Sequence, residues 1–381
     1  MSKIALLSHR GGNIGHDFMA LGIEVALKDA FGSDLQIDHF EQHNHFEVYP
    51  QSHWLRLLHK VPHGRLSLVR RFLNMPKFRE RSWPQTSALE YNLAVSCGGP
   101  NIVPSGLQSP ELGLLLHHMN GAFHYRGVPL IDAGVGASFP LENLPDRYEA
   151  QSDRAFYSSA LRYTTRITVR DLVAENFIRD LGFEPELIPC AAIGCGRLFE
   201  QVKPIGDESK KYVAINFQRV GANSDWGQNV DAIKWMSTIQ TVIADLEKRH
   251  PVMILAHNAY ELKLAQQLAP HIKRVLPTTQ TDYAQTIRMV KAGLVSRIHA
   301  AIPLAGIGVP SVVVGTDTRL GTIDQFGLPT RFVKQASAEW MVDQLETLIC
   351  NSEDERNRLI RLREATMTRY AMLFRRYRRP I

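Results

Sequence analysis

The chain has few cysteines, and their arrangement is not typical of a metal site. Its 381 residues contain only four, which are Cys97, Cys190, Cys195 and Cys350. Structural zinc sites combine two close pairs of Cys or His ligands, and the pair formed by Cys190 and Cys195 has no matching second pair. We therefore expect reduced thiols, no bound metal and no cofactor.

The sequence has no recognisable secretion signal in its first residues and no apolar run that favours a membrane-spanning helix. The first residues, "MSKIALLSHRGG", include only four consecutive apolar residues, too few for the core of a secretion signal. The longest apolar window, 298–315, contains His299, Pro303 and Pro310, which favours a buried strand, helix and strand over one spanning helix. We expect a cytoplasmic protein and leave contact with the inner face of the membrane as an open alternative.

Net positive charge is confined to one segment of the chain. Of the net charge of +6, residues 356–381 contribute nine arginines and one glutamate, so the rest of the chain is slightly acidic. From Asp354 onward the pattern predicts one helix whose apolar side chains pack across two domains while its arginines are solvated. The alternative is a peripheral contact with anionic lipid or polymer. We expect no nucleic-acid partner, because no nucleic-acid-binding motif accompanies the charge.

Short β-rich runs that end in glycine or polar residues alternate with helical patterns along the chain. This alternation is typical of parallel α/β structure. The polar segment "VKPIGDESKK" separates two such series and is the best candidate linker. We therefore predict two Rossmann-like domains facing each other across a cleft. The predicted units are a first domain over 1–201 with an irregular insertion at about 38–87, a linker over 202–211, a second domain over 212–350 and a basic C-terminal helix over 351–381.

The stretch "AGLVSRIHAAIPLAGIG" places Arg297 and His299 inside an otherwise apolar run. "AGLVS" reads as a buried strand and "HAAIPLAGIG" as a short helix, which should begin near Ala300 because proline is best tolerated in a first turn. Ser296, Arg297 and His299 would then lie between the carboxyl end of a parallel strand and a helix N-terminus. Ligands bind at this place in open α/β sheets, and the helix N-terminus favours an anion.

Opposing effects act on the charge of His299. The helix N-terminus and the neighbouring Arg297 should disfavour the imidazolium form, whereas a bound phosphate or carboxylate should favour it. Ligand binding would then load a proton onto His299 and make it a general acid. A core histidine beside a surface arginine is the alternative that spacing alone leaves open.

Other strand ends carry weaker signals of a binding site. "SHRGGNIGHDF" includes Gly12 and Asn13 but does not have the G-x-G-x-x-G spacing, and "SCGGPNI" puts Gly98 and Gly99 where a tight turn is an equal explanation. In "ITVRD", Asp171 is an expected helix N-cap, and Arg170 is either an anion ligand or a solvent-facing charge. Asn216 and Arg219 in "INFQRVG" either line the cleft or face solvent.

Taken in order, these segments resemble the polysaccharide pyruvyl transferase family. The resemblance spans most of residues 4–316 and rests on "GGNIGHDFMALG", "VSCGGPNI", "ITVRDLVAENFIRDLG", "LAHNAYE" and "VSRIHAAIPLAGIGVPSVVVG". It implies a fold like that of GT-B glycosyltransferases. It also implies transfer of a pyruvyl group from phosphoenolpyruvate to two hydroxyls of a sugar, which gives a cyclic ketal and phosphate. The acceptor would be a cell-surface polysaccharide or its lipid-linked precursor.

The resemblance implies roles for Arg297, His299 and Arg170, and the places of the other residues at strand ends suggest theirs. The catalytic pair would be Arg297 and His299. The donor would contact Arg170, Ser296, Asn216 and Arg219. The acceptor side or the cleft would include Gly12, Asn13, His16, Asp17, Gly98, Gly99 and His257.

Two departures from the family pattern bear on these roles. The usual N-I-G-D reads N-I-G-H-D here, so His16 takes the place of the acid. After the last strand the family often has a tyrosine and a lysine, where this chain has "GTDTRLGT" with Asp317 and Arg319. The alternatives are a GT-B-type glycosyltransferase that uses a nucleotide sugar and a catalytically silent saccharide-binding relative.

Overall fold

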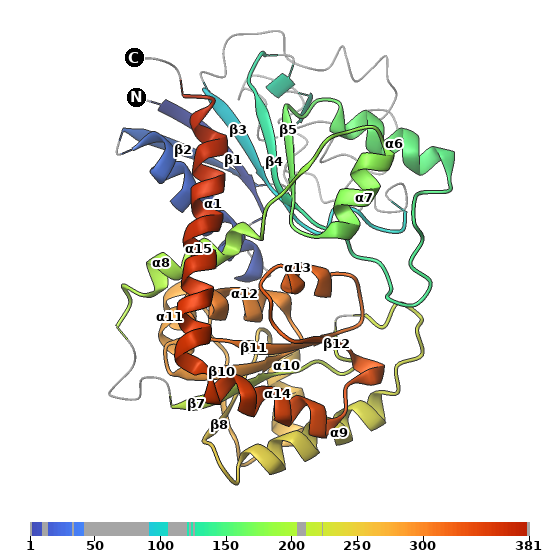
Figure 1. The fold of residues 1–381 in the computed structure, drawn as a ribbon, viewed down its shortest axis with the longest axis vertical. Coiled ribbons are helices and arrows are strands. Elements are labelled where there is room, and N and C mark those ends of the chain that lie inside the picture. Colours follow the sequence, from blue (N-terminus) through green and yellow to red (C-terminus); the bar gives the residue numbers. More distant parts are fainter. Residues whose placement is uncertain are drawn as a thin grey trace.

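The computed structural model describes two α/β domains stacked along the long axis of the molecule (Figure 1). The described residues are 2–9, 14–32, 34–41, 91–105, 120–121, 123–124, 126–203, 211–222 and 224–378. Each domain contains a six-stranded sheet in which every described strand pair is parallel. The predicted architecture of two Rossmann-like domains is confirmed.

The first sheet has the strand order β2-β1-β3-β4-β5-β6. Its strands are β1 (Ser2–Ser8), β2 (Leu35–Glu41), β3 (Leu93–Cys97), β4 (Leu130–Val135), β5 (Arg166–Val169) and β6 (Glu186–Leu187). Its helices are α1 (Ile14–Phe31), α6 (Gln151–Leu161) and α7 (Leu172–Asp180). Every residue of β3 and β4 is buried, as expected for parallel strands covered on both faces.

The second sheet has the order β12-β11-β10-β7-β8-β9, in which β7 and β10 are neighbours. Its strands are β7 (Tyr212–Asn216), β8 (Val252–Leu255), β9 (Lys273–Val275), β10 (Val290–Val295), β11 (Ser311–Gly315) and β12 (Thr330–Phe332). The helices are α9 (Ala232–Leu246), α10 (Ala259–Leu268), α11 (Gln280–Ile287), α12 (Ile298–Gly306), α13 (Leu320–Asp324) and α14 (Ala338–Cys350). Polar N-caps start several of them, including Asn258 on α10 and Thr279 on α11.

A compact segment joins the domains by packing against a helix of each. It consists of the 3-10 turn η3 (Ala191–Gly194) and α8 (Cys195–Phe199). A Cβ on Gly22 of α1 would lie 1.8 Å from the carbonyl oxygen of Ala191, and a Cβ on Gly196 would lie 1.9 Å from that of Gly306 in α12. These glycines let both helices approach the segment, so α1 and α12 are brought close together.

The basic C-terminal segment forms the long helix α15 (Ser352–Arg375), which runs along both domains (Figure 1). Several of its apolar side chains, among them Leu359, Tyr370 and Phe374, are buried, whereas Met372 is exposed. Arg363 donates to the Gly306 carbonyl of the second domain at 2.7 Å, and Arg369 pairs with Glu186 of the first at 3.1 Å. The prediction that this helix packs across both domains is therefore confirmed.

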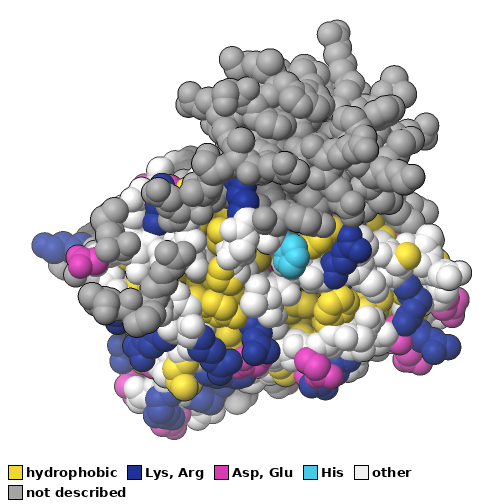
Figure 2. Space-filling model, turned by 90° about the horizontal axis from the view of Figure 1, so that it is seen from above, with side chains coloured by type: hydrophobic (Ala, Val, Ile, Leu, Met, Phe, Trp, Pro, Cys, Tyr) yellow, Lys and Arg dark blue, Asp and Glu magenta, His cyan; other side chains and the backbone are white. Residues whose placement is uncertain are grey.

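The surface at the first-domain end of the molecule carries mixed charge. In the visible described part of this face, Lys and Arg side chains are interspersed with Asp, Glu and apolar ones (Figure 2). None of the helices in the described ranges combines the length and apolar character required to cross a bilayer.

Two local predictions were wrong in detail. The expected irregular insertion begins too early, since residues 38–41 complete β2, and 42–87 lie outside the described residues. Helix α12 starts at Ile298 rather than near Ala300, so Pro303 lies inside the helix. The N–H groups of Ala300 and Ala301 both reach the Arg297 carbonyl, at 2.9 and 3.3 Å, which draws the helix start back. Pro303 then removes only the hydrogen bond to the His299 carbonyl.

Candidate functional site

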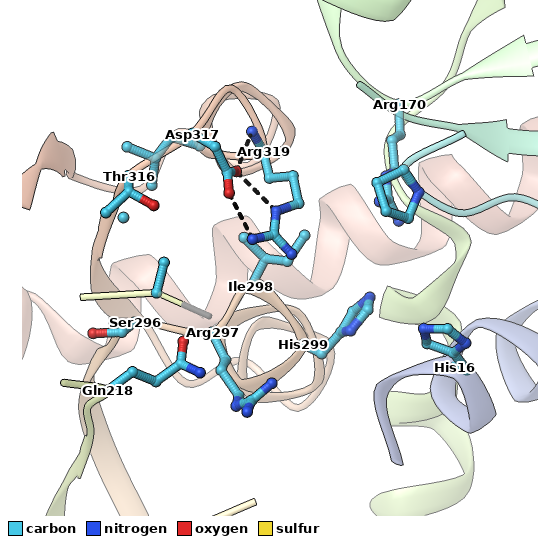
Figure 3. Close-up of a pocket in the computed structure, with 14 residues that line it drawn as sticks. His16, Arg170, Gln218, Ser296, Arg297, Ile298, His299, Thr316, Asp317 and Arg319 are labelled. Carbon is cyan, nitrogen blue, oxygen red and sulfur yellow. Dashed lines mark hydrogen bonds and ion pairs between the residues drawn. The ribbon is translucent and has the colours of Figure 1, made fainter. Parts of the chain in front are cut away.

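A cavity lies between the two domains at the carboxyl ends of their strands (Figure 3). The first domain contributes His16, Pro100 and Arg170 to its lining, and the second contributes Gln218, Ser296, Arg297, His299 and Arg319 among others. The cavity coincides with the points where the strand order of each sheet reverses. Gln218 follows β7 and Ser296 follows β10, whereas His16 and Pro100 follow β1 and β3. Loops diverge at such points and leave room for a ligand.

His299 lies in the first turn of α12, where it faces the first domain. Its half-buried ring packs against Gly15 and lies 5.9 Å, centroid to centroid, from the ring of His16 (Figure 3). Burial, together with the charges of Arg170, His16 and Arg319, lowers the pKa of His299 well below its usual value. The expected direction is confirmed, although Arg170 rather than Arg297 is the main cationic cause. The imidazole is therefore neutral at neutral pH when the cavity holds no anion.

Arg170 is a buried guanidinium whose hydrogen-bonding capacity is largely unused. The side chain is 1% exposed, and Nε and Nη2 have no hydrogen-bond partner among the described residues. Its Nη1 reaches only the Cys190 sulfur, at 3.8 Å. The adjacent Asp171 interacts with its charge but does not hydrogen-bond to it. That carboxylate accepts from the backbone N–H groups of Ala174 and Ala137, at 2.8 and 3.0 Å. Asp171 is thus the N-cap that the sequence predicts.

An unpaired cation in such a place is unfavourable unless a ligand compensates it. Removing a charged group from water without a counter-charge carries a large penalty. Gly136 leaves room for the guanidinium of Arg170, since a Cβ at this residue would lie 2.4 Å from Arg170 Nε. The arrangement is therefore suited to an anion that completes the hydrogen bonds of Arg170.

Arg297 is held by a carboxylate that the sequence pattern did not single out. Its Nε and Nη2 donate to Oε1 of Glu261, at 2.6 and 2.5 Å. The other oxygen of Glu261 accepts from Asn216 Nδ2 at 3.1 Å and from the backbone N–H of His257 at 2.9 Å. Glu261, which is 3% exposed, therefore ties together the ends of β7, β8 and β10.

His257 belongs to this buried support rather than to the cavity wall. Its Nε2 lies 3.3 Å from the hydroxyl of Tyr283, and its Nδ1 is buried without a hydrogen-bond partner in the described structure. Burial, with a contribution from Arg297, lowers the pKa of His257 to about 3. The ring is therefore neutral.

Arg319 is fixed by Asp317 in a bidentate pair beside the cavity (Figure 3). Arg319 Nε donates to Oδ1 of Asp317 at 2.8 Å and Nη2 to Oδ2 at 2.6 Å. Trp226 Nε1 also donates to Oδ2, at 3.2 Å. Of the three arginines that line the cavity, two thus form ion pairs with carboxylates, and Arg170 is the one whose guanidinium has no carboxylate hydrogen-bonded to it in the described structure.

The structure separates the remaining predicted residues into several groups. Asn216 is buried beneath the cavity and does not line it, and neither does Asp17. Arg219 is exposed, because the turn closed by Gly221 N–H on the Gln218 carbonyl directs it outward.

Gly98 and Gly99 make backbone hydrogen bonds to Ala133 and Gly136, at 2.7 and 2.8 Å. The following residue, Pro100, is the one that reaches the cavity. Gly12 and Asn13 lie outside the described residues.

Within the described ranges, no group of three or more His, Cys, Asp and Glu side chains is arranged to bind a metal ion. The chemistry available to these residues is anion binding by arginine and proton transfer by histidine. Glu261 and Trp226 were missed by sequence reasoning. The helix N-cap pattern in "HNAYE" could have drawn attention to Glu261, but no local signal connects it to Arg297.

The fold is similar to those of several solved enzymes that act on sugars. A sucrose-phosphate synthase from Thermosynechococcus elongatus matches with a TM-score of 0.55 and 14% identity, over 99% of each chain. A UDP-GlcNAc 2-epimerase from Neisseria meningitidis bound to UDP-GlcNAc matches with a TM-score of 0.53 and 11% identity, over 98% of this chain and 100% of that one. The UDP-GlcNAc 2-epimerase from Methanocaldococcus jannaschii matches with a TM-score of 0.52 and 10% identity, over 91% of this chain and 92% of that one.

These likenesses establish the fold alone, because fold does not determine function at such low identity. The chain has a GT-B-like fold, as the resemblance in its sequence implies. No family model and no curated protein matches the sequence.

Proposed function

We propose that the protein is a transferase that binds phosphoenolpyruvate between its domains and passes the pyruvyl group to a sugar, forming a cyclic ketal. The observation that carries this proposal is the juxtaposition of Arg170, a buried arginine with unused hydrogen-bond donors, and the neutral imidazole of His299 in one interdomain cavity. Phosphoenolpyruvate has a phosphate and a carboxylate, and planar guanidinium groups bind both through paired hydrogen bonds. The ordered motifs in the sequence support the same donor.

His299 is the proposed proton donor to the methylene carbon. A nearby phosphate or carboxylate raises the pKa of an imidazole, so donor binding would reverse the effect of Arg170 and protonate the ring. The methylene gains that proton and becomes a methyl group, while one sugar hydroxyl bonds to the adjacent carbon. A second hydroxyl then displaces phosphate at the same carbon. Of the two hydroxyl protons, one replaces the proton given to the methylene and the other leaves with hydrogen phosphate.

Arg297 and Arg319 have supporting roles in this proposal. Both are partly saturated by Glu261 and Asp317, so their positions are fixed before a ligand enters. Groups held in place in advance stabilise developing charge more effectively than groups that must reorganise. Ser296 borders the same cavity and is a proposed contact of the donor.

A nucleotide-sugar enzyme is the second candidate, and the fold similarities support it. The matching Neisseria enzyme binds UDP-GlcNAc. A carboxylate commonly holds the ribose of a nucleotide in Rossmann-like domains. Glu261 is a buried carboxylate at the strand ends of the second domain, but it would have to release Arg297 to accept ribose hydroxyls.

One assay separates these functions. The protein is incubated with p-nitrophenyl galactoside, glucoside and mannoside as acceptors, and phosphate release from phosphoenolpyruvate is compared with UDP release from UDP-GlcNAc. Acceptor-dependent phosphate release supports pyruvyl transfer. UDP release would instead support the second candidate. Saccharide binding without either product would indicate a catalytically silent relative.

A lipid-linked acceptor would bring the protein to a membrane surface. The exposed Arg375, Arg376 and Arg378 at the end of α15 are the proposed contact with anionic lipid.

A further inference from the structure

Trp226 is one of the few large apolar side chains exposed on the described surface, and it lies beside the interdomain cavity. Its side chain is 36% exposed, although exposed tryptophan is uncommon. Trp226 does not line the cavity, but its Nε1 donates a hydrogen bond to Asp317, and Asp317 does line it. The indole therefore stands next to the donor cavity with part of its surface open to solvent.

The backbone at Trp226 is held in an unusual conformation. Its φ of 56° lies in the left-handed region, which is rare for a large side chain and persists only where the surroundings enforce it. The surroundings here are hydrogen bonds to Thr316, whose hydroxyl donates to the Ser224 carbonyl and whose carbonyl accepts from Gln228 Nε2, both at 2.7 Å. Strained residues of this kind cluster at ligand-binding sites.

Asp317 connects the indole with the cavity and leaves only the ring face for a ligand. Its carboxylate accepts from Arg319 Nε, Arg319 Nη2, the Arg319 backbone N–H and Trp226 Nε1, so its acceptor sites are filled. The only hydrogen-bond donor of the indole is used as well. What remains is a flat apolar surface whose position is tied to that of Arg319.

The loop that carries Trp226 and the loop that carries Asp317 both touch the first domain. The Glu142 backbone N–H donates to Gln228 Oε1 at 2.9 Å, and Pro140 forms an isolated antiparallel bridge with Asp317. These contacts place Trp226 near the boundary between the two domains.

We propose that Trp226 is the stacking platform of the saccharide subsite, outside the cavity that binds the donor. This inference rests on the proposed transfer to a sugar. A pyranose ring has an apolar face of C–H groups that packs against an aromatic face, and such a face needs no hydrogen-bond partner. The sugar hydroxyls then extend over Asp317 and Arg319 toward His299. A nucleobase also stacks on aromatic rings, and the experiment distinguishes the two.

Binding of methyl β-D-galactopyranoside is measured by saturation-transfer NMR for the wild type, Trp226→Ala and Trp226→Phe. Ile233→Ala is the control, because Ile233 is an 85% exposed apolar side chain on α9. We expect Trp226→Ala to weaken saccharide binding about five- to tenfold, from the energy typical of one aromatic contact. Trp226→Phe should retain most of the affinity, and Ile233→Ala should match the wild type.

Calorimetry with phosphoenolpyruvate on the same proteins separates this inference from the proposed function. Unchanged donor binding with weakened saccharide binding in Trp226→Ala supports the subsite. Saccharide binding that depends on Trp226 without any donor binding would remove the proposed donor and still support the subsite. Equal saccharide affinity in a folded Trp226→Ala protein would overturn it, and so would displacement of the saccharide by uridine monophosphate.

Discussion

The imidazole of His299 occupies the space directly in front of Gly15. A Cβ on Gly15 would lie 2.1 Å from Nδ1 of His299 and 2.4 Å from its Cβ. The whole side chain, and not only the end of the ring, would have to move to accommodate a larger residue. The start of α1 in the first domain thus sets the position of a side chain carried by α12 in the second.

Gly15→Ala should therefore reduce turnover while the protein stays folded. We expect kcat to fall at least about tenfold, because small displacements of a catalytic group have large effects. Acceptor-dependent phosphate release measures this. Gly321→Ala is the matched control, since a Cβ on Gly321 has no neighbour closer than 3.8 Å. Equal losses in both variants would mean that the space in front of Gly15 is unimportant.

His299→Gln tests the proposed proton donor itself. Loss of a general acid typically lowers kcat by about two to four orders of magnitude, with little effect on folding. His271→Gln is the control, because this exposed histidine pairs with Glu247 at a distance from the cavity lining. Near-normal product formation by the His299 variant would remove it from the mechanism.

Glu261→Gln should destabilise the second domain and weaken donor binding together. Removing one charge of a buried ion pair leaves the other uncompensated, and we expect a loss of about 3–5 kcal/mol in the free energy of unfolding. The equivalent change at Glu247, which forms an exposed pair with His271, should alter stability by less than about 1 kcal/mol. Urea unfolding compares the two, and equal stability losses would argue against a special role for Glu261.

Asp132 predicts a pH dependence of stability that is separate from catalysis. Burial raises the pKa of Asp132 to about 6, against hydrogen bonds from Thr164 and Ser96 that lower it. Between the unfolded pKa near 3.8 and the folded value, the folded protein binds more protons, so stability falls as pH rises through this window.

Asp132→Asn should remove the loss of stability that rising pH causes at this carboxyl. Relative to the wild type, the variant should gain about 1–2 kcal/mol in stability between pH 5 and pH 7.5, as denaturant unfolding at the two pH values would show. The exposed Asp146→Asn serves as the control. A difference between variant and wild type that does not change with pH would contradict the buried, protonated carboxyl.

The local sequence predicted the positions of His299 and Arg170 because both follow strand ends, and parallel sheets bring their strand ends together. It did not predict which side chains turn inward. Arg219 also follows a strand, yet the turn at Gly221 points it to solvent. The pairing of Arg297 with Glu261 joins residues 36 positions apart, and such pairing depends on the strand order, which a single sequence does not specify.

The central claim is that Arg170 stands unpaired in order to receive a phosphorylated acid. Calorimetric titration of phosphoenolpyruvate into the wild type and Arg170→Met, with the unfolding temperature of each ligand-free protein, tests it most directly. We predict binding to the wild type alone, and a higher unfolding temperature for the variant because a buried charge has been replaced by an apolar side chain. Equal binding by both proteins, or no heat from the wild type at millimolar phosphoenolpyruvate, would contradict the account.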